Sequence, residues 1–284
     1  YWHKQLCLFA SKSLKSFYTA EKKKKINIEF VSANPTGLMH IGHARGAVLG
    51  DVLASILQSV GHDVVREYYI NDAGNQISSL MNTIYYHLNI DSGKRITQDE
   101  IYPGDYLKEI SKRIAKKFKN FDPKYNYKEI KREVIKIILD DIRSDLRDLS
   151  INHDNFVSEN SLLSKVDLKK FISYLKEQDL IYEGFQDPPK GIESKNWKKQ
   201  KQLLFKSKES GDDSDRALIK PDGEITYFMS DIIYHQDKLN RNYDLILNIW
   251  GADHHGYISR IKNAVKYLSK ENLNFEILLT ALVN

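Results

Sequence analysis

The sequence predicts an α/β fold with a Rossmann-like parallel sheet and an inserted, mainly helical segment. An apolar, β-branched run at 26–32 is followed by a helical pattern at 41–60 and a second strand-like run at 64–70. This strand–helix–strand order is that of a βαβ unit, in which the two strands are parallel. A further buried-strand pattern lies at 244–250, and a last one begins at Phe275.

The middle of the chain differs from both ends and sets the expected domain boundaries. It is rich in Lys, Asp and Glu, is mostly helical in pattern and has no evident strand before residue 150. We therefore expect the α/β core in two parts, at 1–88 and 161–284, separated by a helical insertion at 89–160.

The first part is expected to hold three helices. Residues 2–18 fit an amphipathic helix, and Cys7 in its apolar pattern is expected in the core. The helix at 41–60 should end at Gly61, and the loop NDAGNQ should lead into a helix at 77–88. The apolar residues at helical spacing in the second of these are Val48, Leu49, Val52, Leu53, Ile56 and Leu57.

Later segments are predicted in the same way. One helical face in the insertion carries Ile130, Val134, Ile137, Ile138, Ile142 and Leu146. Residues 161–181 read as one amphipathic helix running into a short strand. An antiparallel hairpin should turn at Pro221-Asp222-Gly223, and Ser230 could cap a helix at 231–241.

Composition favours a globular protein. The chain has 284 residues, of which 41% are hydrophobic and 29% charged, and its net charge is +5. No apolar run reaches membrane-spanning length and no secretory signal is evident, so no membrane partner is expected. A single cysteine excludes an internal disulfide and suits a reducing, cytoplasmic location.

The stretch EFVSANPTGLMHIGHARG, residues 29–46, carries the first candidate site. It leaves the first strand, breaks at Asn-Pro-Thr-Gly and places His40 and His43 where a helix should begin. A helix N-terminus attracts phosphate, and Gly37 and Gly42 let backbone and ligand approach closely. Two imidazoles three residues apart share one helical face and could donate to a phosphate. The alternatives are a capping or surface role for the histidines, or metal binding by the pair.

Four segments together resemble the arginyl-tRNA synthetase family of class I aminoacyl-tRNA synthetases. HIGH lies within VSANPTGLMHIGHARGAVLGDVLASIL, and it is followed in order by YYINDAGNQI, GDDSDRALIKPDGEITYFMSDIIYH and GADHHGYISRIKNAV. The resemblance implies activation of arginine by ATP with Mg²⁺ and transfer of the arginyl group to the arginine tRNA. It implies no permanently bound cofactor, no resident metal site and a monomer.

The resemblance also assigns site residues. The expected catalytic residues are His40 and His43. The expected ATP-binding residues are Gly37, His40, Gly42, His43, Gly251, Asp253 and His254. The expected arginine-binding residues are Glu29, Ser32, Asn34, Asp72, Tyr227 and Asp231. The chemistry agrees, because a guanidinium is a planar fork of donors that a carboxylate such as Asp231 can bind in bidentate fashion.

Each of these residues also has a plainer interpretation. Asp231 could be an ordinary acid in the first turn of a helix, and Tyr227 a core aromatic of the hairpin. Asp72 lies in a segment that could be a simple tight turn. Glu29 in an apolar strand could be a buried ion pair, which is costly and so already suggests a function.

One feature of the family is not found. Class I enzymes carry a lysine-rich loop of the KMSKS type, and the sequence reaches TALVN without one. The expectation is therefore a catalytic core without that loop or the anticodon-binding domain, which binds substrates but is impaired in catalysis.

Three rival functions remain open at this stage. The DHH at Asp253 to His255 also occurs in a family of metal-dependent phosphoesterases, although the early D-x-D loop of such enzymes is missing. Another nucleotidyltransferase or synthetase with the HIGH motif is a second alternative. A non-catalytic tRNA-binding module is the third, but the Lys-rich segments at 22–25 and 195–201 are short for that role.

Overall fold

The computed structural model describes most of the chain. The described residues are 1–11, 19–89, 101–118, 123–186, 200–208, 212, 214–269 and 273–281.

A five-stranded parallel sheet forms the centre of the fold. Its strands are β1 (Lys25–Glu29), β2 (Asp63–Ile70), β3 (Asn155–Ser158), β7 (Leu245–Gly251) and β8 (Asn274–Thr280). They lie in the order β3-β2-β1-β7-β8, and every neighbouring pair is parallel. The chain therefore builds outward from β1 in one direction and then returns to build from β7 in the other. This confirms the Rossmann-like α/β class.

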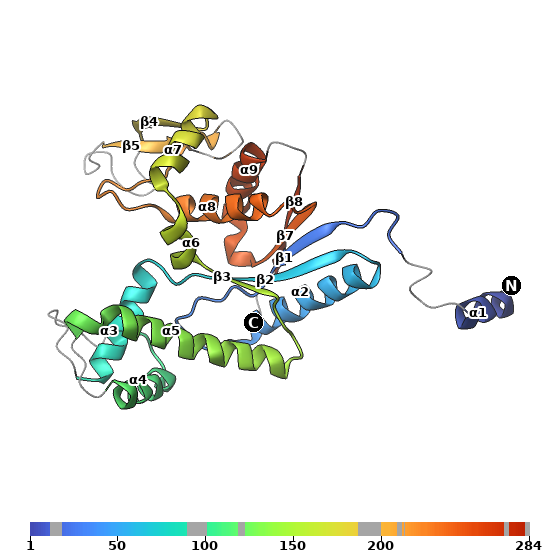
Figure 1. Cartoon of the computed structure of the whole chain (residues 1–284), viewed down its shortest axis with the longest axis horizontal. Coiled ribbons are helices and arrows are strands. Elements are labelled where there is room, and N and C mark those ends of the chain that lie inside the picture. The colour runs from blue at the N-terminus through green and yellow to red at the C-terminus, as the bar shows by residue number, and fades with distance from the viewer. Residues whose placement is uncertain are drawn as a thin grey trace.

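Helices cover both faces of this sheet, as an all-parallel sheet requires. One group is α2 (Ile41–Ser59), α3 (Asn75–His87), α4 (Asp105–Lys117) and α5 (Pro123–Asp148). The other is α6 (Glu159–Lys165), α7 (Leu168–Glu177), α8 (Tyr227–Asn240) and α9 (Ile258–Leu268). Figure 1 shows α3, α4 and α5 below the central strands and α6 to α9 above them.

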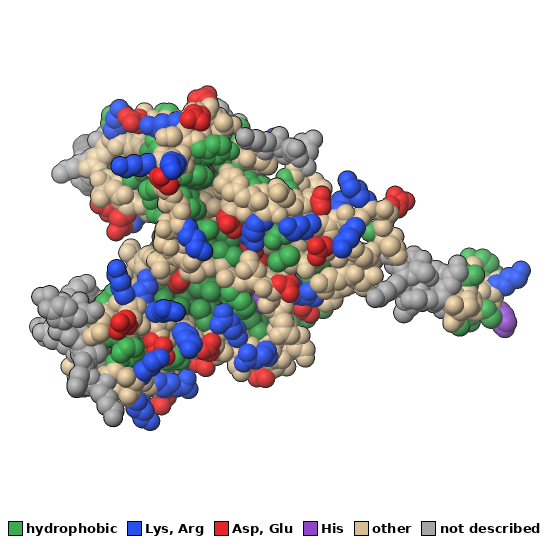
Figure 2. All heavy atoms as spheres, viewed as in Figure 1, with side chains coloured by type: hydrophobic (Ala, Val, Ile, Leu, Met, Phe, Trp, Pro, Cys, Tyr) green, Lys and Arg blue, Asp and Glu red, His purple; other side chains and the backbone are tan. Residues whose placement is uncertain are grey.

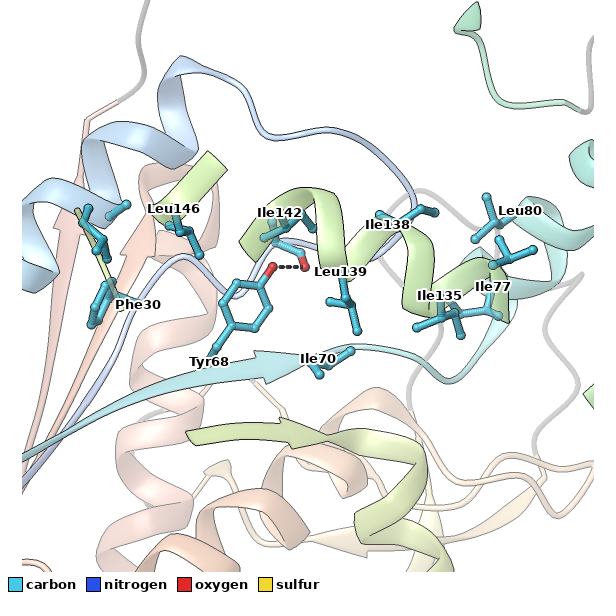
Figure 3. Packing of buried hydrophobic residues seen from close by; sticks show 14 of the residues in the cluster. Phe30, Tyr68, Ile70, Ile77, Leu80, Ile135, Ile138, Leu139, Ile142 and Leu146 are labelled. Atoms are coloured by element: carbon cyan, nitrogen blue, oxygen red, sulfur yellow. Dashed lines mark hydrogen bonds between the residues drawn. The ribbon is translucent and has the colours of Figure 1, made fainter. Parts of the chain in front are cut away.

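The larger core lies between β1, β2 and the first group of helices. In Figure 3, α5 runs along β2 and its side chains point toward Tyr68 and Ile70. The predicted apolar face of this helix is confirmed, because Ile130, Val134, Ile138, Ile142 and Leu146 are all buried and Ile137 packs against them. The Tyr68 hydroxyl donates a hydrogen bond of 2.8 Å to the Ala33 carbonyl, which ties the chain after β1 to this core.

The helix α2 packs mainly through small residues, and of the six large apolar ones predicted for this face only Leu53 and Leu57 pack against the core. Its buried positions are Gly46, Ala47, Gly50 and Ala54. Val48, Leu49, Val52 and Ile56 are exposed. The backbone of α2 thus approaches the sheet closely, and a Cβ on Gly50 would lie 2.2 Å from the Phe30 ring.

A small antiparallel sheet stands beside α7 at the top of Figure 1. It consists of β4 (Ile181–Phe185), β5 (Lys201–Phe205) and β6 (Arg216–Ala217). The predicted turn follows β6, where Ile219 and Ile225 form a bridge and Gly223 has φ +89°. The turn delivers the chain directly to the start of α8.

Several local expectations were wrong. The helix α8 begins at Tyr227 with Thr226 as its N-cap, so Ser230 is an interior residue and not the cap. Residues 161–181 hold two helices and not one, because Asp167 interrupts them and caps α7 by accepting from the Lys170 amide. Cys7 is exposed on α1 (Trp2–Ser11), which stands apart from the other elements in Figure 1, while 12–18 lie outside the described residues.

The domain boundaries remain a prediction, with one amendment. The strand β3 lies inside the range assigned to the helical insertion, yet it pairs in register with β2. We therefore propose that the inserted segment ends before Asn155. No helix among the described residues is long and apolar enough to span a membrane.

Candidate active site

The candidate site residues gather at the carboxyl edge of the sheet. Ser32 and Asn34 follow β1, Asp72 follows β2, and Asp253 follows β7. The strand order reverses between β1 and β7, and ligands of such folds bind outside the strand ends at this reversal. The segments that the sequence singled out therefore reach one side of the molecule.

The two histidines of HIGH build the start of α2. His40 is its N-cap, and its Nδ1 accepts a hydrogen bond of 3.1 Å from the Gly42 amide. His43 Nδ1 accepts from the His40 amide at 3.3 Å, and the two rings stack with centroids 3.7 Å apart. Burial, together with the neighbouring His40, lowers the pKa of His43. The capping interpretation is thus confirmed, and it leaves the exposed His40 ring at a helix N-terminus.

Two of the three candidate glycines lie under a neighbouring side chain. A Cβ on Gly42 would lie 3.0 Å from Cε1 of His40, and one on Gly251 would lie 2.4 Å from Oδ1 of Asp253. At Gly37 the nearest atom would be the Tyr106 hydroxyl at 3.5 Å, an ordinary contact. A side chain at Gly42 or Gly251 would therefore require His40 or the exposed Asp253 side chain to shift.

The segment after β7 is a 3₁₀ turn, η5 (Ala252–Tyr257). Asp253 and His254 are exposed on it, with the His254 Nε2 atom 3.5 Å from Asp253 Oδ2. Both side chains are free to meet a ligand at the strand end.

A group of carboxylates surrounds Tyr69 near the end of β2. Burial raises the pKa of Tyr69, and the charges of Glu159, Asp231, Glu29 and Asp72 raise it further. Tyr69 stacks on Tyr234 of α8 at 4.2 Å, which fixes its ring between sheet and helix. Four acidic residues from four separate segments thus converge on one buried aromatic ring.

Within the described residues, Asp231 and Glu159 meet cations only at a distance: the charge of Arg260 partly offsets the raised pKa of Asp231, and that of Lys131 partly offsets the raised pKa of Glu159. Tyr257 donates a hydrogen bond of 2.6 Å to Asp231, and Ser230 donates to Glu159. Neither carboxylate forms a salt bridge there, and one Glu159 oxygen is buried without a hydrogen-bond partner. Burial, followed by the charges of Glu159 and Glu29, raises the pKa of Asp231 to about 7 despite the Tyr257 hydrogen bond. Such a pair is arranged to receive a positive group.

Glu29 is in a different electrostatic state. Its Oε2 accepts a 2.6 Å hydrogen bond from the ammonium of Lys238, and its Oε1 accepts from the Ser32 hydroxyl at 3.1 Å. Glu29 is buried, whereas Asn34 is exposed at the rim. The buried ion pair considered for Glu29 is therefore present, and Glu29 holds the loop that carries Ser32.

Asp72 and Tyr227 border the acidic group. Asp72 accepts from the Ser158 hydroxyl at 2.7 Å and from the Asn160 amide at 2.8 Å, so it fixes the two neighbours of Glu159. Tyr227 is exposed at the start of α8, and a Cβ on Gly74 would lie 3.4 Å from its hydroxyl. The core-aromatic interpretation of Tyr227 is thus wrong, since the helix begins at this residue.

The sequence reasoning missed Glu159, Tyr69 and Lys238. Glu159 follows β3, a strand that was hidden in a charged region. Lys238 lies seven residues after Asp231, a spacing that places both on one face of a helix. Glu67 and Tyr69 are polar residues two positions apart in the otherwise apolar β2 run. They could have indicated that one face of the sheet carries buried charged groups.

The fold and the site together define a nucleotide-binding α/β domain of the Rossmann type. Residues 6–276 match the family model described as tRNA synthetases class I (R), catalytic domain, and the chain belongs to this family. The segment at Asp253 to His255 is therefore part of a synthetase domain, and the phosphoesterase alternative is set aside.

Curated relatives bear the same family assignment. The arginine–tRNA ligase of Wolbachia pipientis subsp. Culex pipiens is 46% identical over 261 residues, which cover 91% of this chain and 46% of the relative. That of Rickettsia bellii is 43% identical over 289 residues, covering 100% of this chain and 50% of the relative. The chain thus spans about half the length of these relatives.

Solved structures agree with the fold. A Campylobacter jejuni structure assigned as an arginyl-tRNA synthetase has a TM-score of 0.77 and 36% identity, covering 93% of this chain and 56% of that one. The Thermus thermophilus arginyl-tRNA synthetase has a TM-score of 0.64 at 17% identity, covering 92% and 49%. The second likeness shows the fold alone.

Proposed function

We propose that this chain is the arginine-activating core of an arginine–tRNA ligase. The observation that carries the proposal is the pair of carboxylates, Asp231 and Glu159, which both act on Tyr69 and form no salt bridge within the described part of the chain. A guanidinium brings a fixed positive charge and a fork of donors, which can satisfy two carboxylates at once. We assign Ser32, Asn34 and Tyr227 to the remaining groups of arginine.

ATP would bind beside this pocket, at the reversal of strand order. We assign its phosphates to the N-terminus of α2 with His40 and His43, and its nucleoside to Gly251, Asp253 and His254. A helix N-terminus favours phosphate because its amides and dipole are positive. ATP would supply the adenylyl group that is transferred, and Mg²⁺ bound with it would offset the charge of its phosphates.

The reaction needs positioning more than acid–base chemistry. The arginine carboxylate attacks the α-phosphorus in line, and diphosphate leaves. The protein's part is to hold the two substrates and to donate hydrogen bonds from imidazole and amide groups to the charge that develops. His43 lies partly buried beneath the His40 ring, so its lowered pKa favours a neutral imidazole at the start of the reaction.

Transfer to an arginine tRNA completes the proposed function. Figure 2 shows Lys and Arg side chains on the lower half of the visible face, interspersed with Asp and Glu. On α4 two of these lysines pair with Asp105 and Glu109, so they do not form an uninterrupted basic stripe. This distribution gives no support to a purely tRNA-binding module.

A monomeric state, a cytoplasmic location and impaired catalysis by the chain alone stay predictions.

Calorimetric titration of arginine into the chain tests the proposal without requiring turnover. Lysine and citrulline are the competitors, since citrulline keeps the shape of arginine but has no charge. We expect selective arginine binding that Asp231→Asn and Glu159→Gln each weaken by about tenfold or more. Glu183→Gln is the matched control, because this carboxylate is exposed and pairs with Lys201 in the small sheet.

Equal binding of citrulline and arginine would contradict a guanidinium pocket. If a folded chain binds none of the three, the titration is repeated on a chain extended toward the length of the relatives. Absence of binding there too would refute arginine as the substrate.

A further inference from the structure

A row of polar side chains crosses the sheet beneath α8. Asn155, Glu67, Glu29 and Asn248 are neighbours in register on β3, β2, β1 and β7. All four are largely or fully shielded from solvent. Since register partners on neighbouring strands point to the same face, these side chains form one line across the sheet.

The helix α8 supplies two cations to this row. Arg241, at its C-terminal end, binds Glu67, which also accepts from Tyr234 at 2.7 Å and from Asn155 at 2.8 Å. Lys238 binds Glu29 at 2.6 Å and lies 3.9 Å from Glu67. Two carboxylates and two cations make the row electrically balanced, unlike the pair formed by Asp231 and Glu159.

Lys238 is fully buried and stands at a junction. Besides Glu29, its ammonium donates to Asn248 Oδ1 at 2.9 Å. A buried ammonium that loses a hydrogen bond to the protein cannot replace it with one to solvent. A lysine held by a carboxylate and an amide oxygen in this way therefore has little freedom to move.

One branch from Lys238 leads to Asp231. Asn248 uses its oxygen to accept from Lys238, so its Nδ2 donates to His235 Nε2 at 3.1 Å. His235 Nε2 is then an acceptor, so the proton of the neutral ring is on Nδ1, which donates to the Asp231 carbonyl at 2.8 Å. The ammonium of Lys238 thus sets the direction of each hydrogen bond in this series. The series ends at the backbone carbonyl of Asp231, the residue that we assign to the guanidinium.

The other branch leads to the loop after β1. Glu29, held by Lys238, accepts from the Ser32 hydroxyl, and Ser32 Oγ accepts from the Tyr69 amide at 3.0 Å. Ser32 and the preceding Val31 both have positive φ, at 41° and 69°. Non-glycine residues take this conformation only when their surroundings hold them there.

We propose that Lys238 is the positioning residue of the arginine pocket, holding its two walls, the loop after β1 and the first turns of α8, at a fixed separation. The inference rests on the proposed function for the identity of the ligand, but the hydrogen-bond chain itself does not depend on it. Lys238 touches neither substrate. It acts through Glu29 on one wall and through Asn248 and His235 on the other.

A purely structural role for Lys238 is the competing explanation, and Arg241 provides the matched control. Both are cations of α8 that neutralise a buried carboxylate of the same row. Only Lys238 is connected to Asp231 through Asn248 and His235. Lys238→Met and Arg241→Met therefore remove comparable ion pairs but only the first cuts the path to the pocket.

The experiment measures arginine and ATP binding separately in wild type, Lys238→Met and Arg241→Met. We expect Lys238→Met to weaken arginine binding by about tenfold or more and to leave ATP binding within about twofold. Arg241→Met should change neither by more than about twofold. His235→Phe is the second variant, since it keeps an aromatic ring of similar size, and we expect it to weaken arginine binding in the same direction.

Amide hydrogen exchange gives a readout that is independent of arginine. In Lys238→Met the amides at 231–235 should lose protection relative to those of α5, whereas Arg241→Met should leave that ratio unchanged. Unchanged arginine affinity in a folded Lys238→Met or His235→Phe protein would overturn the proposal. If wild type binds no arginine, the exchange ratio alone decides whether Lys238 holds the walls: an unchanged ratio in Lys238→Met would overturn the proposal.

Discussion

The hydroxyl of Tyr106 donates a hydrogen bond of 2.7 Å to the backbone carbonyl of Thr36. Tyr106 lies at the start of α4, in the inserted segment, and Thr36 lies in the Asn-Pro-Thr-Gly loop that precedes α2. The same ring occupies the space that a Cβ on Gly104 would need, since such an atom would lie 2.5 Å from the ring, and Gly104 has φ +128°. The inserted helices are therefore joined directly to the loop that presents His40.

Tyr106→Phe should loosen this loop without disturbing the fold. The change removes one partly buried hydrogen bond, which costs about 1 kcal/mol of unfolding free energy. Because the proposed phosphate site lies at the end of this loop, ATP affinity should fall about threefold to tenfold while arginine affinity stays unchanged. Calorimetry with each ligand and urea unfolding measure the two effects.

Tyr86→Phe is the control for this variant, since Tyr86 is an exposed tyrosine on α3. It should match wild type in ATP affinity and in stability. If Tyr106→Phe and Tyr86→Phe gave the same ATP affinity, the link between the insertion and the loop would have no role in binding.

Arginine binding should release a proton near neutral pH. In the free protein burial and neighbouring carboxylates raise the pKa of Asp231 to about 7, far above its usual 3.8. A bound guanidinium favours the ionised carboxylate and so lowers this pKa. The affinity should therefore rise about tenfold per pH unit as the pH approaches 7 from below, and level off above it.

Calorimetry at pH 6.5 in two buffers of different ionisation enthalpy would count the released protons. Asp231→Asn should bind weakly and show no dependence on pH over this interval. A wild-type affinity that is flat between about pH 5.5 and 7 would show that Asp231 does not titrate on binding.

The sequence was sufficient for those parts of the fold that depend on local pattern. The apolar runs at 64–70 and 244–250 became parallel strands because β-branched and aromatic side chains suit a sheet buried on both faces. The run at 26–32 did so only in part, since β1 ends at Glu29 and Val31 and Ser32 have positive φ. The HIGH segment became a helix start, as predicted, with His40 as the N-cap. These features are read from neighbouring residues and need no knowledge of the tertiary structure.

Tertiary contacts decided the rest. The short strand β3 was hidden because its burial comes from pairing with β2, a partner about 90 residues away in the chain. Glu159 therefore went unnoticed although it follows that strand. Likewise Glu29 and Lys238 are 209 positions apart, so no local pattern could pair them.

Gly50 should tolerate no side chain. It faces the sheet from α2, and a Cβ there would lie 2.2 Å from the Phe30 ring, which is fully buried. Gly50→Ala should lower the unfolding free energy by about 1–3 kcal/mol, measured by urea denaturation.

Gly46 on the same helix is the matched control, because a Cβ there would meet nothing within 4 Å. Gly46→Ala should be neutral or stabilising by up to about 1 kcal/mol, since alanine is the better helix former. A Gly50→Ala protein as stable as Gly46→Ala would mean that α2 does not pack on β1 through this contact.

A buried histidine should make the fold sensitive to mild acid. His153 packs against Phe30, with ring centroids 4.2 Å apart, and its Nε2 lies 3.3 Å from the Phe30 carbonyl. Burial lowers its pKa to about 4, although the carbonyl opposes this. The unfolded chain, where the pKa is near 6.5, binds this proton more readily, so stability is full above pH 6.5 and falls as the pH drops toward 4.

His153→Phe should remove this part of the acid sensitivity, because the ring can no longer take a proton. The lowered pKa of His153 corresponds to a loss of about 3 kcal/mol of unfolding free energy between pH 6.5 and 4. His235, whose pKa burial lowers to about 3, continues to titrate in the variant, so the plot of unfolding free energy against pH should flatten but not become level.

Urea unfolding across this pH interval compares the two proteins, with His3→Gln on the exposed face of α1 as the control. An unfolding free energy that falls as steeply in His153→Phe as in wild type would show that His153 takes up no proton when the protein unfolds.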